Sequence, residues 1–546
     1  MVTYAFKSDY TPEIPDDESE KLSTTIKLSE VLAAGVRLEA SAFSIEAHNA
    51  VTALTNSGLP LIPLYGKEGL CQEAHNAFRF KRIYVDAEHG IPFLSSSDII
   101  SLRPRIENYL SRKYTQNLSK LLIQKWDILI SCSGTVGNVS LACETLAGKA
   151  LSQDAIRLRA TDPDLAGFIA AFLRSRYGRP QLTQATYGSV IVHIEPEHLE
   201  RVLIPDLPPI RRIEIGRLMC KAGELRDEAN HLLDEADRLL HERLNLPYLK
   251  DITPRGSASF TTTIKASQLM GRLEASFHNP EAIAAEKQLA QLPVEITKIG
   301  DQRITKEVRA ITRFRARTYV EKGGIPLLSS KQLFQVDPIG LKFLAKGAHF
   351  DDLPEIALNE GMIAVTCSGT IGKVQIIPKY MEDWASSQDS IRVIASKEIN
   401  EGYIYTWLSS DYGESLIKRH SYGSVIVHID REMLASVHIP LPEPKIRNEI
   451  GDLVLKANQL RDQAWRSEQE AISKLEKLIS SKSNTPMNNQ TPIESFSFAN
   501  IKFDYNAEPI WELAARLSAK IPNEEWAKLP KDLAQNFDHY QQQQDS

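Results

Sequence analysis

The sequence has few cysteines, and it lacks long apolar runs. Its five cysteines form no CxxC pair and their number is odd, which disfavours a disulfide framework or a zinc site and favours reduced thiols. No stretch approaches the roughly 18 consecutive apolar residues of a membrane-spanning helix, and the first twenty residues are polar and unlike a signal peptide. We therefore expect a cytoplasmic protein with no membrane association.

An excess of basic residues is also missing. The net charge is −6 and the pI is about 6.2, so nucleic-acid binding would have to depend on a local basic patch. The chain has no NPPY- or DPPY-type methyltransferase motif, no HExxH and no GxSxG. The segments CSGTVG and CSGTIGK lack the GxxxxGK[ST] spacing of a phosphate-binding loop. These absences predict a binding protein that is not an enzyme and needs no cofactor or metal.

What the sequence does contain is an internal duplication. The octapeptide YGSVIVHI occurs at 187–194 and again at 422–429, 235 positions apart. RLEAS, GIP, CSGT and SQD motifs, and the pair RIYV and RTYV, recur in the same order and at nearly the same spacing. A unit of this length indicates a duplicated domain rather than a solenoid repeat.

Each unit begins with a globular part that mixes short alternating apolar runs with glycine and proline. DILISCSGTVGNVSL, for example, predicts a strand, a glycine turn and a second strand. The 546 residues suggest two to four domains. The fold class we expect is α/β, with two mixed α/β domains, each followed by a long α-helix.

The helical part of each unit carries apolar residues at alternating steps of three and four, which is a heptad seam. Each helix would have about 35–40 residues and a length of about 50–60 Å. It could pack on its own domain, but two equal seams favour antiparallel pairing of the two helices as a coiled coil. The candidate pairing residues are Leu218, Leu225, Leu232, Leu239, Leu453 and Leu460.

These patterns predict the organisation of the whole chain. The expected parts are an N-terminal arm (1–23), a first globular domain (24–207), a central helix with its linker (208–257), a second globular domain (258–442), a distal helix (443–482) and a C-terminal segment (483–546). The C-terminal segment contains a polar linker, a partial third repeat and a glutamine-rich tail, which we expect to be disordered.

Basic residues recur at matching positions of the two units. If the end of 303–320 is a strand, alternate basic residues share one face with a tyrosine, as expected of a DNA-facing surface. A second basic cluster precedes each octapeptide. A solvated charged strand is the alternative, but the recurrence favours DNA contact. These candidates are Arg79, Lys81, Arg82, Tyr84, Arg174, Arg176, Arg179, Arg313, Arg315, Arg317, Tyr319, Lys418 and Arg419.

The recurring motifs also allow a structural interpretation. The CSGT turns need glycine at 134, 137, 369 and 372 for backbone geometry, and their hydroxyls could in addition hold a DNA phosphate. The corresponding candidates are Ser133, Thr135, Ser368 and Thr370, together with Tyr187 and Tyr422 of the octapeptides. For His193 and His428 a satisfied histidine is favoured over a metal ligand, and for SQD a turn or cap is favoured over acid–base chemistry.

The order of motifs resembles the specificity subunit of type I restriction–modification systems. RLEAS, CSGTVG or CSGTIG, YGSVIVHI, and the helix starts IPDLPPIRRIEI and IPLPEPKIRNEI carry the resemblance, which covers roughly 24–482. It implies a phage-defence protein whose two target-recognition domains each read one half of a bipartite DNA site. The helices would then set the gap between the half-sites and dock two methyltransferase subunits and, in some systems, a restriction or translocase subunit.

In this interpretation the repeated motifs are scaffold. The stretches that differ between the copies, roughly 52–78 against 288–312 and 98–125 against 331–361, would carry the two half-site specificities for DNA methylation. The alternative is a protein–protein adaptor that is built from duplicated domains and does not read bases.

Overall fold

The computed structural model describes residues 44–184, 193–253, 263–266, 269, 271–311, 317–320 and 323–482. The chain divides into two compact units, 1–485 and 486–546, and every described residue belongs to the first. The expected N-terminal arm (1–23) and C-terminal segment (483–546) lie outside the described residues.

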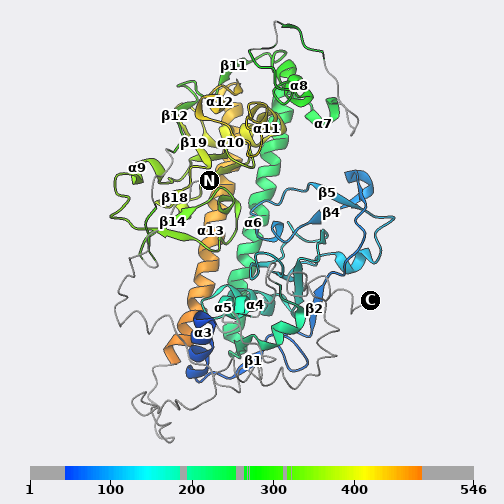
Figure 1. The fold of residues 1–546 in the computed structure, drawn as a ribbon, viewed down its shortest axis with the longest axis vertical. Helices are drawn as coiled ribbons and strands as arrows, with labels where there is room; N and C mark the ends of the chain where they lie inside the picture. Colours follow the sequence, from blue (N-terminus) through cyan, green and yellow to red (C-terminus); the bar gives the residue numbers. More distant parts are fainter. Residues whose placement is uncertain are drawn as a thin grey trace, which may run out of the picture. The chain divides into compact units, whose positions relative to one another are not determined.

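The described chain is a mixture of helices and short strands, which confirms the predicted mixed α/β class (Figure 1). The α-helices are α3 (Ile45–Asn56), α4 (Pro163–Arg174), α5 (Arg179–Gln184), α6 (Pro209–Leu244), α7 (Leu249–Ile252), α8 (Pro280–Leu289), α9 (Leu353–Ile356), α10 (Glu401–Ser409), α11 (Asp411–Lys418), α12 (Arg431–Ala435) and α13 (Pro444–Lys482). Short 3₁₀ helices are η3 (Ala87–His89), η4 (Asp98–Ile100), η5 (Leu118–Leu121), η6 (Pro196–Arg201), η8 (Gln332–Phe334) and η9 (Lys379–Met381).

The strands of the first half form three sheets. One sheet has the order β2-β9-β6-β7 and is antiparallel, the second has the order β3-β5-β4-β8 with β4 and β8 parallel, and β1 pairs with β10. Their bounds are β1 Leu61–Pro63, β2 Glu73–Asn76, β3 Tyr84–Val85, β4 Gly90–Leu94, β5 Asn108–Ser111, β6 Ile128–Ser131, β7 Val139–Leu141, β8 Ala150–Leu151, β9 Ala155–Arg159 and β10 Leu203–Pro205. The first strand and the last strand of this half therefore lie side by side.

The second half repeats this topology. Its sheets have the orders β12-β19-β16-β17 and β13-β15-β14-β18, and β11 pairs with β20. The bounds are β11 Glu295–Lys298, β12 Thr305–Arg309, β13 Tyr319–Val320, β14 Ile325–Leu328, β15 Lys342–Leu344, β16 Ile363–Thr366, β17 Val374–Ile376, β18 Ala385–Ser386, β19 Ser390–Ala395 and β20 His438–Leu441. The repeated sequence thus folds into a repeated structure. The segment around CSGTVG is strand β6, a glycine turn and strand β7, as predicted.

Helices α4 and α10 occupy equivalent places, and each crosses a long helix at a pair of glycines. A Cβ atom on Gly167 of α4 would lie 2.3 Å from the carbonyl oxygen of Gly216 in α6. A Cβ atom on Gly402 of α10 would lie 2.2 Å from the carbonyl oxygen of Gly451 in α13. Because only glycine permits this approach, the glycine pairs set where each globular half sits on its long helix.

The long helices α6 and α13, of 36 and 39 residues, contact each other and run antiparallel (Figure 1). Ion pairs join Lys474 to Glu214 near one end of α6 and Lys456 to Glu228 further along it. In α6 the buried stripe is wider than the predicted seam. Of the predicted seam leucines, Leu232 is buried, whereas Leu218, Leu225 and Leu239 are half-buried. The residues beside them in the sequence, Met219, Leu233 and Leu240, are buried. In α13, Leu460 is buried and Leu453 is half-buried. Helix α6 therefore packs on α13 and on globular parts at once.

Each long helix starts in one half and ends in the core of the other. The core of the first half includes Ala471, Leu475 and Ile479 from the end of α13. The core of the second half includes Leu240 and Leu244 from the end of α6. Burial of apolar surface stabilises a protein by about 25 cal/mol per Å², so these side chains stabilise the packing of each half against both helices.

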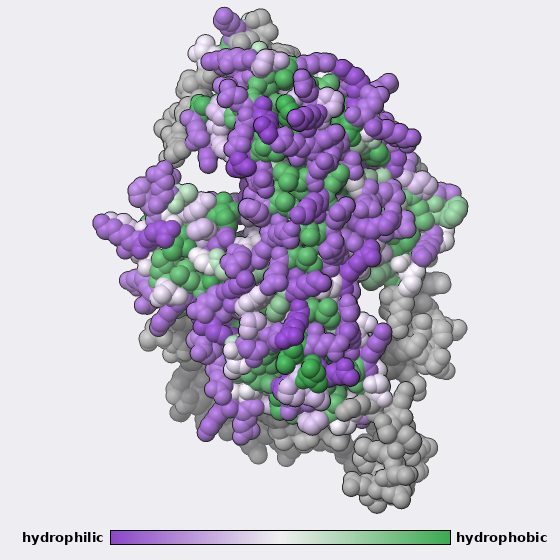
Figure 2. Space-filling view, turned by 180° about the vertical axis from the view of Figure 1, so that it is seen from behind, coloured by the Kyte–Doolittle hydropathy of each residue, from purple (hydrophilic) through white to green (hydrophobic). Residues whose placement is uncertain are grey.

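The surface seen from behind is mainly hydrophilic, with hydrophobic residues interspersed along the long helices (Figure 2). No helix among the described residues is long and apolar enough to cross a membrane.

Candidate nucleic-acid interface

The recurring motifs, which are far apart in sequence, meet in space. In the second half the backbone N–H of Cys367 donates to the carbonyl of Asp389 (3.0 Å), and the N–H of Ile429 donates to the carbonyl of Cys367 (3.0 Å). Ser368 and His428 form a β-bridge between the glycine turn and the octapeptide. CSGT, SQD and YGSVIVHI thus form one backbone network.

The first half has the same network at positions 235 residues earlier. The N–H of Cys132 donates to the carbonyl of Asp154 (3.0 Å), and the N–H of Ile194 donates to the carbonyl of Cys132 (3.0 Å). Ser133 and His193 form the equivalent bridge. The motifs recur because they build the same local structure twice.

The glutamine of each SQD motif holds the arginine of RIYV or RTYV. Arg82 donates from Nη2 to Oε1 of Gln153 at 2.8 Å, and Arg317 makes the equivalent bond to Gln388. Arg82 also lies over the ring of Phe93, 5.1 Å from its centroid. A neutral amide partner orients each guanidinium. Our sequence analysis missed both glutamines, although the recurrence of SQD was the available signal.

The SQD segments themselves form turns, the interpretation favoured from sequence. The hydroxyl of Ser152 accepts from the N–H of Asp154 at 3.3 Å, and that of Ser387 accepts from the N–H of Asp389 at 3.4 Å. Among the residues that the structure describes, no three His, Cys, Asp or Glu side chains are grouped to hold a metal ion.

An open hollow of about 770 Å³ in the second half has the three motifs in its wall, and its lining includes Ser368, Gln388, Tyr422 and His428. Tyr422 is exposed, as are Tyr84 and Tyr319, the tyrosines that follow the two glutamine-bound arginines. Exposed aromatic rings beside basic side chains and hydroxyls are suited to a nucleic-acid surface.

Other candidate residues lie on the surface. Arg79, Lys81, Thr135 and Thr370 are exposed. Ser133 is half-buried within the turn, as is Ser368. Arg313, Arg315 and Tyr187 lie outside the described residues.

Three basic candidates form ion pairs at or near the surface. Lys418 is half-exposed and binds Glu414. Arg179 binds Asp337. The guanidinium of Arg176 lies over the ring of Tyr177 at 4.9 Å and its Nε is 3.8 Å from Glu476 of α13. Each of these charges is partly compensated within the protein.

Two predicted DNA contacts are buried and have structural partners. Arg174, whose side chain is 2% exposed, binds Glu468 through both terminal nitrogens at 2.7 and 3.0 Å. Arg419, also buried, binds Glu286 at 3.0 Å and lies over the ring of Phe277 at 4.2 Å. The spacing of basic residues does not reveal burial, and neither guanidinium faces solvent here, so we leave both out of the proposed DNA surface.

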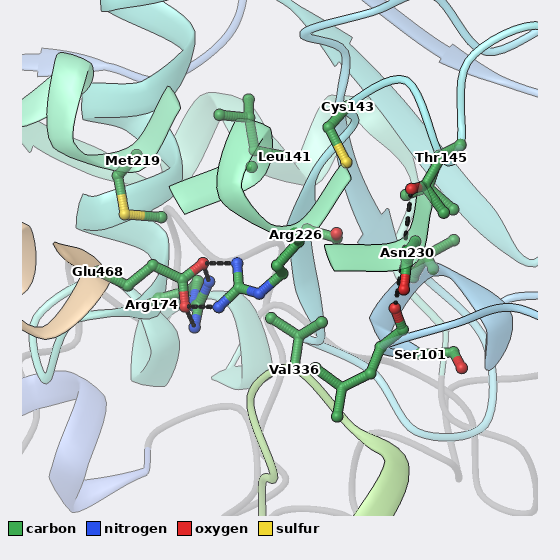
Figure 3. A pocket seen from close by; sticks show the side chains of 15 residues that line it. Ser101, Leu141, Cys143, Thr145, Arg174, Met219, Arg226, Asn230, Val336 and Glu468 are labelled. Carbon is green, nitrogen blue, oxygen red and sulfur yellow. Dashed lines mark hydrogen bonds and ion pairs between the residues drawn. The ribbon is translucent and has the colours of Figure 1, made fainter. Parts of the chain in front are cut away.

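Glu468 of α13 is the centre of an ion cluster that the sequence did not reveal (Figure 3). Its carboxylate binds Arg174 of α4 and Arg226 of α6, and Arg174 also lies 3.3 Å from Asp337 of the second half. A cavity of about 30 Å³ adjoins the cluster. Burial alone would raise the pKa of Glu468, but the two arginines outweigh it and lower that pKa to about 2.

One family model matches part of the second half. Residues 306–458, which contain the network of the second half, match the family model described as "Type I restriction modification DNA specificity domain". This segment is therefore similar to the DNA specificity domains of type I restriction–modification systems, in agreement with the resemblance seen in the motifs.

Three solved structures that are similar to this chain come from type I restriction–modification systems. They include the S subunit from M. genitalium (15% identity, 78% of this chain and 100% of that chain, TM-score 0.29) and the HsdS subunit from Thermoanaerobacter tengcongensis (13% identity, 78% and 97%, TM-score 0.24). A third structure is described as the basis of complex assembly and conformational transition of the type I R-M system (15% identity, 78% and 97%, TM-score 0.25). None of the curated proteins matches the sequence.

Proposed function

We propose that this chain is the DNA-specificity subunit of a type I restriction–modification-like complex, with no catalytic site of its own. The observation that carries the proposal is that two halves with one topology present the same motif network, one of them inside a matched DNA specificity domain. Each half would read one half of a bipartite DNA site.

The antiparallel helices would act as a coiled-coil spacer between the two readers. Arg243 of α6 binds Glu449 of α13, so the Gly451 crossing lies about 25 residues along α6 from the Gly216 crossing. At 1.5 Å per residue this is about 38 Å. That length is close to one turn of B-DNA, about 34–36 Å, so the two halves could engage one face of a duplex. We assign the readers to 24–207 and 258–442 and the spacers to 208–257 and 443–482.

The DNA-facing surface would divide its tasks between shared and divergent residues. Contacts to phosphates position the domains and carry no sequence information, whereas base edges in the grooves specify the site. We assign phosphate or backbone contacts to Arg79, Lys81, Arg82, Tyr84, Ser133, Thr135, Arg317, Tyr319, Ser368, Thr370, Lys418 and Tyr422, and to Tyr187, Arg313 and Arg315 outside the described residues. The stretches that differ between the halves would read bases.

The partners of such a subunit would be double-stranded DNA, two methyltransferase subunits and, in a restricting system, a nuclease or translocase subunit, all in the cytoplasm. Two weak readers on a spacer gain affinity through effective concentration, which suits a bipartite site.

Methylome sequencing of cells that carry the methyltransferase, with and without this chain, tests the function directly. We expect a two-part methylated motif with a fixed gap only when the chain is present. Methylation that is independent of the chain, with the methyltransferase shown to be active, would instead favour the protein–protein adaptor.

Replacing Arg317 by alanine should weaken binding to all duplexes by about tenfold, because it removes a positive charge from the proposed DNA surface. The slope of log affinity against log salt should become shallower by about 0.9, the value for one phosphate contact. Arg82→Ala should have the same effect in the first half. Arg238→Ala, which removes an exposed arginine of α6, is the matched control. An unchanged salt slope for Arg317→Ala would exclude a phosphate contact.

A further inference from the structure

The octapeptide of the second half exposes apolar side chains to solvent. Val425 is 94% exposed and Ile426 is 55% exposed, and the neighbouring Val427 is exposed as well. Among the described residues, Val425 is the most exposed of the large hydrophobic side chains. We call Tyr422–His428 the apolar hairpin.

The backbone holds the apolar hairpin in this conformation. Tyr422 and His428 exchange both N–H to carbonyl bonds, at 2.9 and 2.8 Å. The N–H of Gly369 in the glycine turn donates to the carbonyl of Val427 at 3.0 Å. Gly423 has a φ of +102°, and a Cβ atom there would lie 2.3 Å from the carbonyl of Ile426. The tip is therefore ordered by hydrogen bonds and not by packing of its apolar side chains.

The identity of the two octapeptides needs a cause other than core packing. The two halves differ at most positions, yet 187–194 and 422–429 are the same, including the residues that are exposed in the second half. Solvent exposure of valine and isoleucine contributes nothing to folding, so a shared ligand is the physical reason to keep them. A ligand feature common to both halves cannot be a base sequence that differs between half-sites.

The surroundings of the hairpin favour DNA over a protein surface. A second hollow, of about 720 Å³, is lined by Val427 of the hairpin and by Thr370, Lys373, Lys418, Arg105, Glu107 and Glu414. Lys373 is exposed, and Glu414 partly compensates Lys418 and Arg105. Hydroxyls and cations beside an apolar tip match the phosphates and the sugar and base faces of a duplex. The cores of protein–protein interfaces, by contrast, are depleted of charge.

We propose that the apolar hairpin is a wedge that enters the minor groove and packs Val425 and Ile426 against sugars and a base step, independently of sequence. Apolar wedges of this kind partly unstack a base step and bend the duplex. The proposal rests on the proposed DNA-binding function. No bond is formed or broken.

The test uses the full chain with its methyltransferase and a labelled mixed-sequence 40-bp duplex. The variant is Val425→Ser with Ile426→Ser, and Ile210→Ser, which removes an exposed apolar side chain at the start of α6, is the control. We expect about tenfold weaker DNA binding with an unchanged salt slope, because no charge is removed, and an unchanged Tm.

The outcomes separate the hairpin from the function as a whole. Unchanged DNA binding by the double variant overturns the proposal that the hairpin is a wedge, and it leaves the proposed function intact. Intact DNA binding with loss of the methyltransferase from the complex also overturns it and assigns the hairpin to a protein contact. Failure of the unmodified complex to bind the duplex overturns both proposals.

Discussion

Replacing Glu468 by glutamine is expected to destabilise the protein by about 3–5 kcal/mol, because two buried guanidiniums then lose their carboxylate. Arg226 would keep no acidic partner among the described residues, and Arg174 would keep only Asp337, 3.3 Å away. The amide preserves shape, so the loss measures charge and not packing. Chemical denaturation of the full chain gives the free energy of unfolding. Since the free energy of unfolding of a typical protein is about 5–15 kcal/mol, a loss of this size should be readily measurable.

Glu470→Gln on the same helix is the matched control. Glu470 is about half exposed and lies 3.4 Å from Lys474, so its loss should change stability by less than about 1 kcal/mol. Equal effects of the two substitutions would mean that the buried ion cluster contributes no more to the free energy of unfolding than a surface ion pair does.

The same cluster predicts an acid dependence. Burial raises the pKa of Glu468, but the arginines lower it further, to about 2 in the folded protein against 4.5 for an unperturbed glutamate. Because the folded pKa is depressed, the contribution is complete above about pH 4.5 and is lost as the pH falls toward 2. The stability difference between the unmodified chain and Glu468→Gln should therefore shrink over that interval. A constant difference across it would contradict the assignment.

Gly216→Ala is expected to destabilise the first half by about 2 kcal/mol or more, as overpacking at a backbone contact does. A Cβ atom there would lie 1.8 Å from the carbonyl oxygen of Asp164, so α4 or α6 has to shift. A fall in Tm and in the denaturation midpoint would report the loss.

Gly223→Ala, two turns further along the same helix, is the control. Its Cβ atom would lie 3.4 Å from the nearest atom, which is ordinary contact, and alanine favours the helix by up to about 1 kcal/mol. We expect Gly223→Ala to be neutral or stabilising. If both alanines behave alike, the close crossing is not what positions α4 on α6.

Local pattern predicted much of this molecule. The repeat at 235 positions predicted two equivalent halves, and the recurring strand orders agree with it. Alternation and glycine predicted the β6–β7 hairpin, and the apolar spacing predicted two helices of about the right length. These features depend on residues that are near one another in the chain, so a sequence pattern is sufficient to find them.

The residues predicted to contact DNA differ in their exposure to solvent. Arg82 is exposed and Arg317 is half-buried, and each binds the glutamine of an SQD motif. Arg174 and Arg419, equally basic in sequence, are buried in ion pairs. Charge alone does not distinguish these cases, because burial depends on which element packs over a side chain.

The periodicity of the sequence determined which segments are helices, strands and turns, and its repetition determined that there are two of each. Only the tertiary structure decided that each long helix ends in the core of the opposite half. It also placed Glu468 of α13 against Arg174 and Arg226, which are 294 and 242 residues away in the sequence. It joined CSGT, SQD and YGSVIVHI in one backbone network. The physical reason is the separation along the chain over which each kind of interaction acts. Backbone preferences and hydrophobic spacing act over a few residues, whereas ion-pair partners, close glycine crossings and shared surfaces arise only when distant segments pack together.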